Sequence, residues 1–217
     1  MTETFRTIRS FDVLGQLMAD ARGWRVNVGR SCKTANRQTF RLWFDADSNG
    51  GKLALAMFIT PPTQMPTLKN VNNAILTAVA DAGYGTGADV KLNELHFSLL
   101  LLYDDASLSI RRDVSALLDH LSAESNGNFV VELWHVKNLQ YNVLRCADVP
   151  KHTRLDKDAI ARLPCPPSKL PHILISDPIV HALGARIGDV LHVLRVDSRF
   201  GEIPYWRLVV DDSAVFK

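Results

Sequence analysis

Two adjacent carboxylates could carry chemistry at the end of an apolar segment. Asp104 and Asp105 directly follow the run His96–Tyr103, and metal-dependent nucleases often hold a divalent cation with carboxylates in such a place. No Glu-x-Lys motif follows on a segment that could pair with this run. We therefore expect the two aspartates to cap the helix that Ser107 precedes. A metal-dependent, nuclease-like enzyme built on the front of the chain stays as the alternative.

Other motifs that could support catalysis are incomplete. The glycines of Gly83–Gly87 look like a phosphate-binding loop, but a dinucleotide motif must follow a strand and open a helix, and this segment follows a predicted helix. The seven histidines lack the spacing of metal ligands, and the three cysteines are odd in number and lack C-x-x-C spacing. No G-x-S-x-G motif is present. The sequence therefore predicts no catalytic residue, no metal site and no cofactor.

The first forty or so residues of the chain are rich in basic side chains and contain few acidic ones. Lys33, Arg37 and Arg41 continue a series of arginines that begins in the opening helix. Guanidinium groups on one face neutralise phosphates and give weak, salt-sensitive, sequence-independent contacts with a DNA duplex. The alternative is a solvated helix face or a contact with another protein chain. We expect five residues of this series to lie near DNA: Arg6, Arg9, Arg22, Arg25 and Arg30.

Composition limits the classes of protein that the chain can belong to. Its 217 residues lie between one and two average domains, and 47% hydrophobic content suffices for real cores. The chain has 25 Lys and Arg and 23 Asp and Glu, so its net charge is close to zero. Any contact with nucleic acid must therefore come from a local basic patch. The cysteine pattern favours a reducing compartment. No apolar run is long enough to cross a bilayer, and the first residues lack the hydrophobic core of a signal peptide.

The elements that position these residues form an α/β pattern over the first two-thirds of the chain. Apolar residues at three- and four-residue steps predict an opening helix from Phe5 to Ala21, which Gly23 ends. Two further helices are predicted, at Leu68–Val79 and Ile110–Leu121. Four strands are predicted, at Thr39–Phe44, Leu53–Thr60, His96–Tyr103 and Phe129–Val136. This alternation predicts a sheet flanked by helices.

The closing stretch Leu170–Val209 predicts a small α+β unit. Ser176-Asp177-Pro178 is a helix-start signal, and Gly184 would end the short helix in a left-handed cap. A mostly buried strand at Val190–Val196, a loop at Asp197–Pro204 and an antiparallel partner at Tyr205–Val210 would follow. A domain with so small a core usually needs contacts with another domain or protein for its stability.

The spacing L-P-x-I-x-x-S-D-P-x-x-x-x-L-G-x-x-x-G-x-V, followed by a lone Arg and Y-W-R-L-V, resembles the C-terminal assembly domain of the fifth common subunit of eukaryotic RNA polymerases and its archaeal counterpart. The matching residues are Leu170, Pro171, Ile173, Ser176, Asp177, Pro178, Leu183, Gly184, Gly188, Val190, Arg195, Gly201, Arg207, Leu208 and Val209. Upstream, Asn142, Val149, Pro150 and His152 match the family's connector between domains. Cys146 and Asp148 depart from it, and the segment that follows is shorter than usual.

The front of the chain resembles the N-terminal jaw of the eukaryotic members, through Arg22-Gly23-Trp24 and a strand running into Pro61-Pro62. The resemblance implies an α/β jaw domain at residues 1–144 and a small α+β assembly domain at residues 145–217. The assembly domain would anchor on the largest polymerase subunit, and the jaw would lie beside downstream double-stranded DNA. The docking surface or its support would comprise Asp177, Pro178, Arg195, Tyr205 and Arg207, and the alternative is that these residues brace the domain internally.

The function implied is that of a non-catalytic subunit of nuclear DNA-directed RNA polymerase, in a hetero-oligomer with no membrane contact. The resemblance leaves open whether the chain serves polymerases I, II and III or is a paralogue dedicated to one, polymerase I included, which would place it in the nucleolus. A copy encoded by a large DNA virus and a free transcription adaptor also stay open.

Overall fold

The computed structural model describes residues 3–33, 36–46, 52–59, 66–83, 96–104, 112–125 and 127–212. Contacts divide the chain into two compact units. The first unit comprises Met1–Ala19 and Gly23–Tyr141, and the second comprises Asp20–Arg22 and Asn142–Lys217. The domain boundary expected after Leu144 lies just beyond this division. Pro61-Pro62, Tyr84–Gly87, Asp105 and Ser107, all used in the sequence analysis, lie outside the described residues.

The first unit is built on a five-stranded sheet in the order β1-β2-β3-β4-β5. Its strands are β1 (Arg25–Val26), β2 (Leu42–Asp45), β3 (Leu53–Phe58), β4 (Phe97–Tyr103) and β5 (Phe129–His135). β1, β2 and β3 pair antiparallel, whereas β3, β4 and β5 pair parallel. Every residue of β4 is buried, as expected for the apolar central strand of a parallel sheet.

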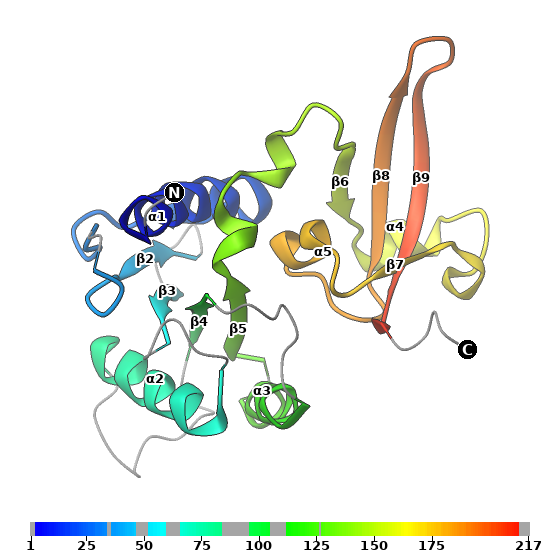
Figure 1. Ribbon diagram of the computed structural model, residues 1–217. Helices are drawn as coiled ribbons and strands as arrows, with labels where there is room; N and C mark the ends of the chain where they lie inside the picture. The colour runs from blue at the N-terminus through cyan, green and yellow to red at the C-terminus, as the bar shows by residue number, and fades with distance from the viewer. Residues whose placement is uncertain are drawn as a thin grey trace. The chain divides into compact units, whose positions relative to one another are not determined.

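Helices cover both faces of this sheet (Figure 1). α2 (Leu68–Asp81) and α3 (Arg112–Glu124) pack on one face, where Val71 and Val114 share a core with Leu99 and Val131. α1 (Glu3–Arg22) covers the other face, and the ring of Phe11 meets that of Phe40 edge-on at 5.6 Å. The predicted α/β class, with a sheet flanked by helices, is confirmed. Within the described residues, no helix is both long and apolar enough to cross a membrane.

The second unit contains a four-stranded sheet in the order β6-β8-β9-β7. Its strands are β6 (Lys151–Arg154), β7 (His172–Leu174), β8 (Val190–Asp197) and β9 (Gly201–Val210). Only β7 and β9 pair parallel. The other elements are short: η2 (Val136–Leu139), which ends the first unit, and then η3 (Val143–Arg145), α4 (Lys157–Ala161), η4 (Pro167–Lys169) and α5 (Pro178–Leu183).

The predicted helix of the closing stretch is present as α5, with both of its expected ends. The Asp177 carboxylate accepts the backbone N–H of Ile179 at 2.8 Å, which satisfies one of the donors left free at a helix start. Gly184 closes the helix at φ 64°, in the left-handed region that glycine adopts without strain. Val180 then packs against Leu191 and Val209 of the sheet.

The β8–β9 hairpin is longer than the sequence predicts. The expected loop Asp197–Pro204 is mostly strand, because pairing continues to Asp197 opposite Gly201. The Asp197 carboxylate accepts the N–H groups of Arg199 and Phe200 and so builds the tight turn. The expectation of a mostly buried β8 is correct only for its first half, since Val196 is 80% exposed. Pro204 is a misleading loop signal, because proline is tolerated on a strand that has a neighbour on one side only.

Candidate functional site

Three of the predicted docking residues share one face of the β8–β9 hairpin. Opposite residues in an antiparallel pair point to the same face, and the side-chain period along a strand is two. Arg195 lies opposite Ile203, Tyr205 opposite Val193, and Arg207 opposite Leu191. The hairpin therefore aligns Arg195, Tyr205 and Arg207 along a single face. At its inner end, this face runs into the core that Leu191 forms with α5.

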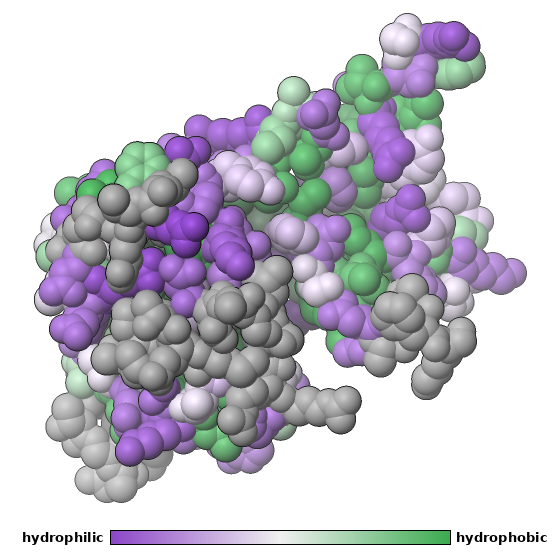
Figure 2. Space-filling model, viewed as in Figure 1, coloured by the Kyte–Doolittle hydropathy of each residue, from purple (hydrophilic) through white to green (hydrophobic). Residues whose placement is uncertain are grey.

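The outer part of the hairpin, residues 195–205, is here called the hairpin arm. β6 pairs with β8 only as far as Leu194, and β7 pairs with β9 only from Leu208 onward. Within the described sheet, the strands of the arm therefore have only each other, and Figure 1 shows them extending past β6 and β7. Phe200 at the turn is 78% exposed. Apolar and strongly hydrophilic side chains both reach the surface along the arm (Figure 2).

Asp177 and Pro178 act where α5 begins rather than on the arm. The carboxylate of Asp177 is occupied as the helix cap, and Pro178 takes the first helical position. Ser176 does not share the capping role, because its hydroxyl donates to the carboxylate of Asp212 at 2.8 Å. These contacts favour the internal bracing alternative for Asp177 and Pro178.

Arg22, predicted to lie near DNA, binds the last turn of α5. Its Nε donates to Ala182 O at 3.0 Å and its Nη2 donates to His181 O at 2.9 Å. The last carbonyls of a helix lack intrahelical donors, and a cation is favourable there. The guanidinium also lies against Gly184, where a Cβ atom would approach Arg22 Cζ to 3.0 Å. Sequence reasoning misses this contact because no local spacing relates Arg22 to α5.

A second cluster of the second unit joins Asp20 to the connector. The Asp20 carboxylate accepts from Arg145 Nε at 2.6 Å and Nη2 at 3.0 Å, and from Asn142 Nδ2 at 2.8 Å. The hydrogen bond from Arg145 is the main cause that lowers the pKa of Asp20, and burial opposes it. The connector pattern identifies Asn142, but neither Asp20 nor Arg145. The separation of 125 positions between those two leaves no signal in the sequence.

Ion pairs divide the basic residues at the start of the chain into two groups. Lys33 pairs with Asp12, Arg37 with Asp104, and Arg41 with Asp81. Arg22 binds backbone carbonyls of α5. Among the described residues, no acidic partner lies within salt-bridge distance of the other four, which form the second group: Arg6, Arg9, Arg25 and Arg30. The second group therefore carries the net positive charge of this region.

These four arginines of the first unit lie on three segments. Arg6 and Arg9 belong to α1, and the Nε of Arg9 donates to the backbone carbonyl of Gln140. Arg25 belongs to β1, exposed and opposite Asp45 in register. Arg30 follows in a turn, exposed, with its Cζ 5.6 Å from the ring centroid of Trp43. Exposed guanidinium groups at Arg9, Arg25 and Arg30 are accessible to phosphates.

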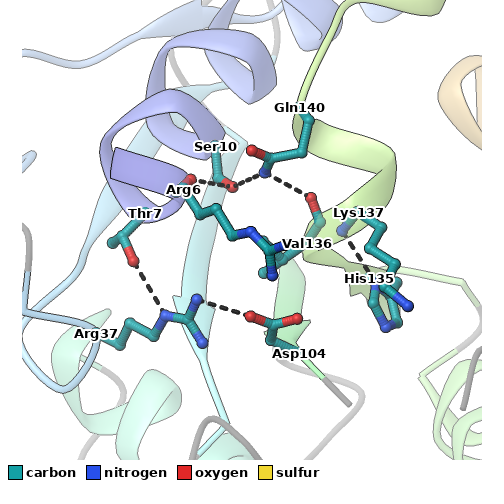
Figure 3. A network of polar contacts seen from close by, with 9 residues as sticks. All are labelled: Arg6, Thr7, Ser10, Arg37, Asp104, His135, Val136, Lys137 and Gln140. Atoms are coloured by element: carbon teal, nitrogen blue, oxygen red, sulfur yellow. Dashed lines mark hydrogen bonds and ion pairs between the residues drawn. The ribbon is translucent and has the colours of Figure 1, made fainter. Parts of the chain in front are cut away.

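Asp104 does not have the surroundings of a metal ligand. Its carboxylate binds Arg37 Nη2 at 2.8 Å, and Arg37 Nε also donates to the hydroxyl of Thr7 (Figure 3). The side chains of Arg37 and Asp104 are 3% and 15% exposed. A guanidinium therefore stands where a divalent cation would have to bind. No cluster of three or more potential metal ligands occurs in the part of the chain that the structure describes.

Comparison with known proteins identifies the family. A model of the RNA polymerase Rpb5 C-terminal domain matches residues 141–209. DNA-directed RNA polymerase subunit Rpo5 of Pyrococcus horikoshii is 34% identical over 77 residues, which are 34% of this chain and 94% of that protein. The chain belongs to the Rpb5 family of RNA polymerase subunits. This confirms the resemblance of its closing stretch.

Two further Rpo5 proteins match a similar share of this Rpb5-family chain. That of Thermococcus celer is 44% identical over 68 residues, 30% of this chain and 83% of its own length. That of Methanosarcina barkeri is 30% identical over 76 residues, 33% of this chain and 97% of its own length. The matched family domain spans η3 to β9 and includes the hairpin arm.

Proposed function

We propose that this Rpb5-family chain is a non-catalytic subunit of a nuclear DNA-directed RNA polymerase and that it docks on the largest subunit through its hairpin arm. One observation carries the docking proposal: Arg195, Tyr205 and Arg207 share one face of an exposed hairpin within the family domain. The assembly partners are other polymerase subunits, and nucleotide addition belongs to them.

The physical properties of the arm support a role in docking. An isolated two-stranded hairpin is marginally stable in water, so contact with a partner would stabilise the arm. Val196 and Phe200 are both largely exposed on this arm. Arginine and tyrosine are also the residue types that most often dominate binding energy at interfaces. A partner that covers the arm would bury these groups.

The first unit is proposed to act as a jaw beside downstream DNA. Arg9, Arg25 and Arg30 supply exposed positive charge, and Arg6 adds to it from the same helix as Arg9. Such contacts follow the phosphate backbone and are independent of sequence, which suits a surface past which DNA slides. Arg22 contributes least to this proposal, since its guanidinium already binds two carbonyls of α5.

The identity of the polymerase that this subunit serves is proposed from two residues of the connector. Cys146 and Asp148 depart from the family's connector, and these departures favour a paralogue dedicated to one polymerase, with polymerase I and a nucleolar location as the specific case. Cys146 ends η3, with its Sγ 3.7 Å from Asn142 O. A shared subunit of polymerases I, II and III is the second candidate.

Affinity purification of the tagged chain, followed by size fractionation, tests this function. We expect the largest subunit of a nuclear polymerase to co-purify at matching stoichiometry, and its identity names the polymerase. Recovery of the chain only in small fractions, or with substoichiometric polymerase, would instead favour the free adaptor. Divalent-metal-dependent DNA cleavage by the purified chain would revive the nuclease alternative, which the Arg37–Asp104 pair disfavours.

A further inference from the structure

A small pocket lies in the first unit between α1 and the segment that follows β5. It has a volume of about 130 Å³ and is lined by Arg6, Val136, Lys137 and Gln140. By this kind of measure about 10–15 Å³ is enough for one water, so the pocket has room for a compact polyatomic ion. Figure 3 shows the Arg6 side chain reaching from α1 toward Val136, and the Lys137 side chain extending from the next residue on the side away from Arg6.

Hydrogen bonds hold the two walls of the pocket together. Gln140 Nε2 donates to Ser10 Oγ at 3.2 Å and to Val136 O at 2.8 Å. Ser10 Oγ in turn donates to Arg6 O, one helical turn earlier. The backbone N–H of Lys137 donates to Nδ1 of the buried His135 at 3.0 Å. Both segments that carry the cations are therefore fixed before any ligand binds, which lowers the entropic cost of binding.

The charges around this pocket favour an anion. Arg6 and Lys137 both line it, and among the described residues neither has a carboxylate within salt-bridge distance. The nearby Arg37 is neutralised by Asp104 and adds no net charge. Arg6 and Lys137 each carry one positive charge, and an anion bound beside these lining residues would be attracted to both. Arginine and lysine are also the side chains that most often bind phosphate oxygens.

The pocket lies at one edge of the sheet of the first unit. β3, β4 and β5 are parallel, so their carboxyl ends meet at one edge of the sheet. Asp104 directly follows β4, His135 ends β5, and Val136 and Lys137 come next in the chain. The pocket therefore opens at the carboxyl edge of the parallel strands.

From the pocket, its charges and its position we propose that Arg6 and Lys137 bind a phosphate group, as the dianion of inorganic phosphate or of a small phosphomonoester. A phosphodiester of a nucleic-acid backbone also offers non-bridging phosphate oxygens, but only two of them and a single negative charge, and the test separates this source from a free phosphate. The proposal shares Arg6 with the proposed DNA-facing set but requires neither polymerase membership nor duplex binding.

The test is a titration of the full-length, isotope-labelled chain with inorganic phosphate at constant ionic strength, with chloride as the balancing anion. We expect saturable amide shifts confined to the first turns of α1 and to residues 136–140. Arg6→Gln and Lys137→Gln should each weaken binding about tenfold, since each removes one charge-assisted contact. Lys69→Gln, an exposed charge change on α2, serves as the matched control and should leave binding unchanged.

Non-saturating shifts, or equal affinity in the wild type and both pocket variants, would overturn the proposal. A small phosphomonoester and a short DNA duplex then identify the source. Displacement of phosphate by the duplex, lost in the same two variants, assigns the site to backbone phosphate. Displacement by the phosphomonoester alone assigns it to a free phosphate. If the chain binds phosphate saturably but binds no duplex, the proposal of DNA contact is contradicted and the proposal of a phosphate site is supported.

Discussion

The guanidinium of Arg195 lies over the ring of Tyr205, with its Cζ 5.3 Å from the ring centroid. Both residues are exposed, and they lie on adjacent strands of the hairpin arm. A cation over an aromatic face gains roughly 0.5–1 kcal/mol at an exposed site, and the contact limits the conformations of two large side chains. The arm therefore presents an ordered surface, which reduces the entropy lost when a partner binds.

The cap of α5 should make a measurable contribution to stability. Asp177→Ala removes the acceptor of the Ile179 N–H, and loss of such a cap costs about 1 kcal/mol. Hydrogen exchange of the α5 and β8 amides should become faster, whereas Asp177→Ser, which can also cap the helix, should restore much of the protection. Equal exchange in Asp177→Ala and the wild type would show that the cap is not needed.

The left-handed end of α5 allows a comparison of two glycines. Gly184 and Gly188 both have positive φ, but a Cβ added at Gly184 would lie 3.0 Å from Arg22 Cζ, whereas one added at Gly188 would meet nothing within 4 Å. Both changes to Ala should add backbone strain, which is about 1–2 kcal/mol for a residue in the left-handed helical conformation that Gly184 adopts. Gly184→Ala should cost more, because it also displaces Arg22 from the carbonyls of α5. Chemical denaturation measures the difference, and equal costs would argue against the Arg22 contact.

Acid should weaken the Asp20–Arg145 contact. The pKa of Asp20 is lowered in the folded chain, mainly by the hydrogen bond from Arg145. A lowered pKa means that its contribution to stability is present above the unfolded-state pKa, near 4, and is lost as the pH falls through the folded-state pKa. Asp20→Asn should therefore be less stable than the wild type at pH 7, and the difference in stability should shrink as the pH is lowered below about 4, as urea denaturation over a series of pH values measures. A difference in stability that does not shrink on acidification would contradict this.

The buried ion pair of the first unit should be structural. Asp104→Ala removes one carboxylate partner of the Arg37 guanidinium, which is 3% exposed, and breaking a buried pair in this way costs about 3–5 kcal/mol. Arg37→Met together with Asp104→Ala should recover much of that loss, because no buried charge is left uncompensated. Thermal unfolding of the single and double variants measures both effects. If Asp104→Ala were as stable as the wild type, the pair would have no structural role.

The parts of the fold that sequence patterns predict are those governed by local chemistry. α1 follows from apolar periodicity and ends just before Gly23, at φ 69°. α5 follows from Asp177, Pro178 and Gly184, because a cap acts within a few residues of the helix that it ends. The core strands β4 and β5 follow from continuous or alternating apolar residues.

The parts that sequence patterns do not predict depend on contacts between distant residues. Arg22 meets α5 across 159 and 160 positions, and Arg37 meets Asp104 across 67. No spacing rule connects such pairs, so sequence alone groups Arg22 with the DNA-facing arginines and leaves Asp104 as a conceivable metal ligand. The sequence underestimates the length of the hairpin because Pro204 and Gly201 are ordinary loop signals. Nothing local distinguishes Lys137, because only the fold brings it to a pocket with Arg6.

The central claim is that the hairpin arm, with Arg207 at its base, attaches this chain to the polymerase. Its most direct test is the ratio of largest subunit to tagged chain after affinity purification of the double variant Arg195→Glu with Arg207→Glu. Lys157→Glu, an exposed charge reversal in the same unit, is the matched control. We predict that the ratio falls about tenfold or more in the double variant and is unchanged in the control. An unchanged ratio in a double variant that keeps wild-type hydrogen-exchange protection would contradict the claim.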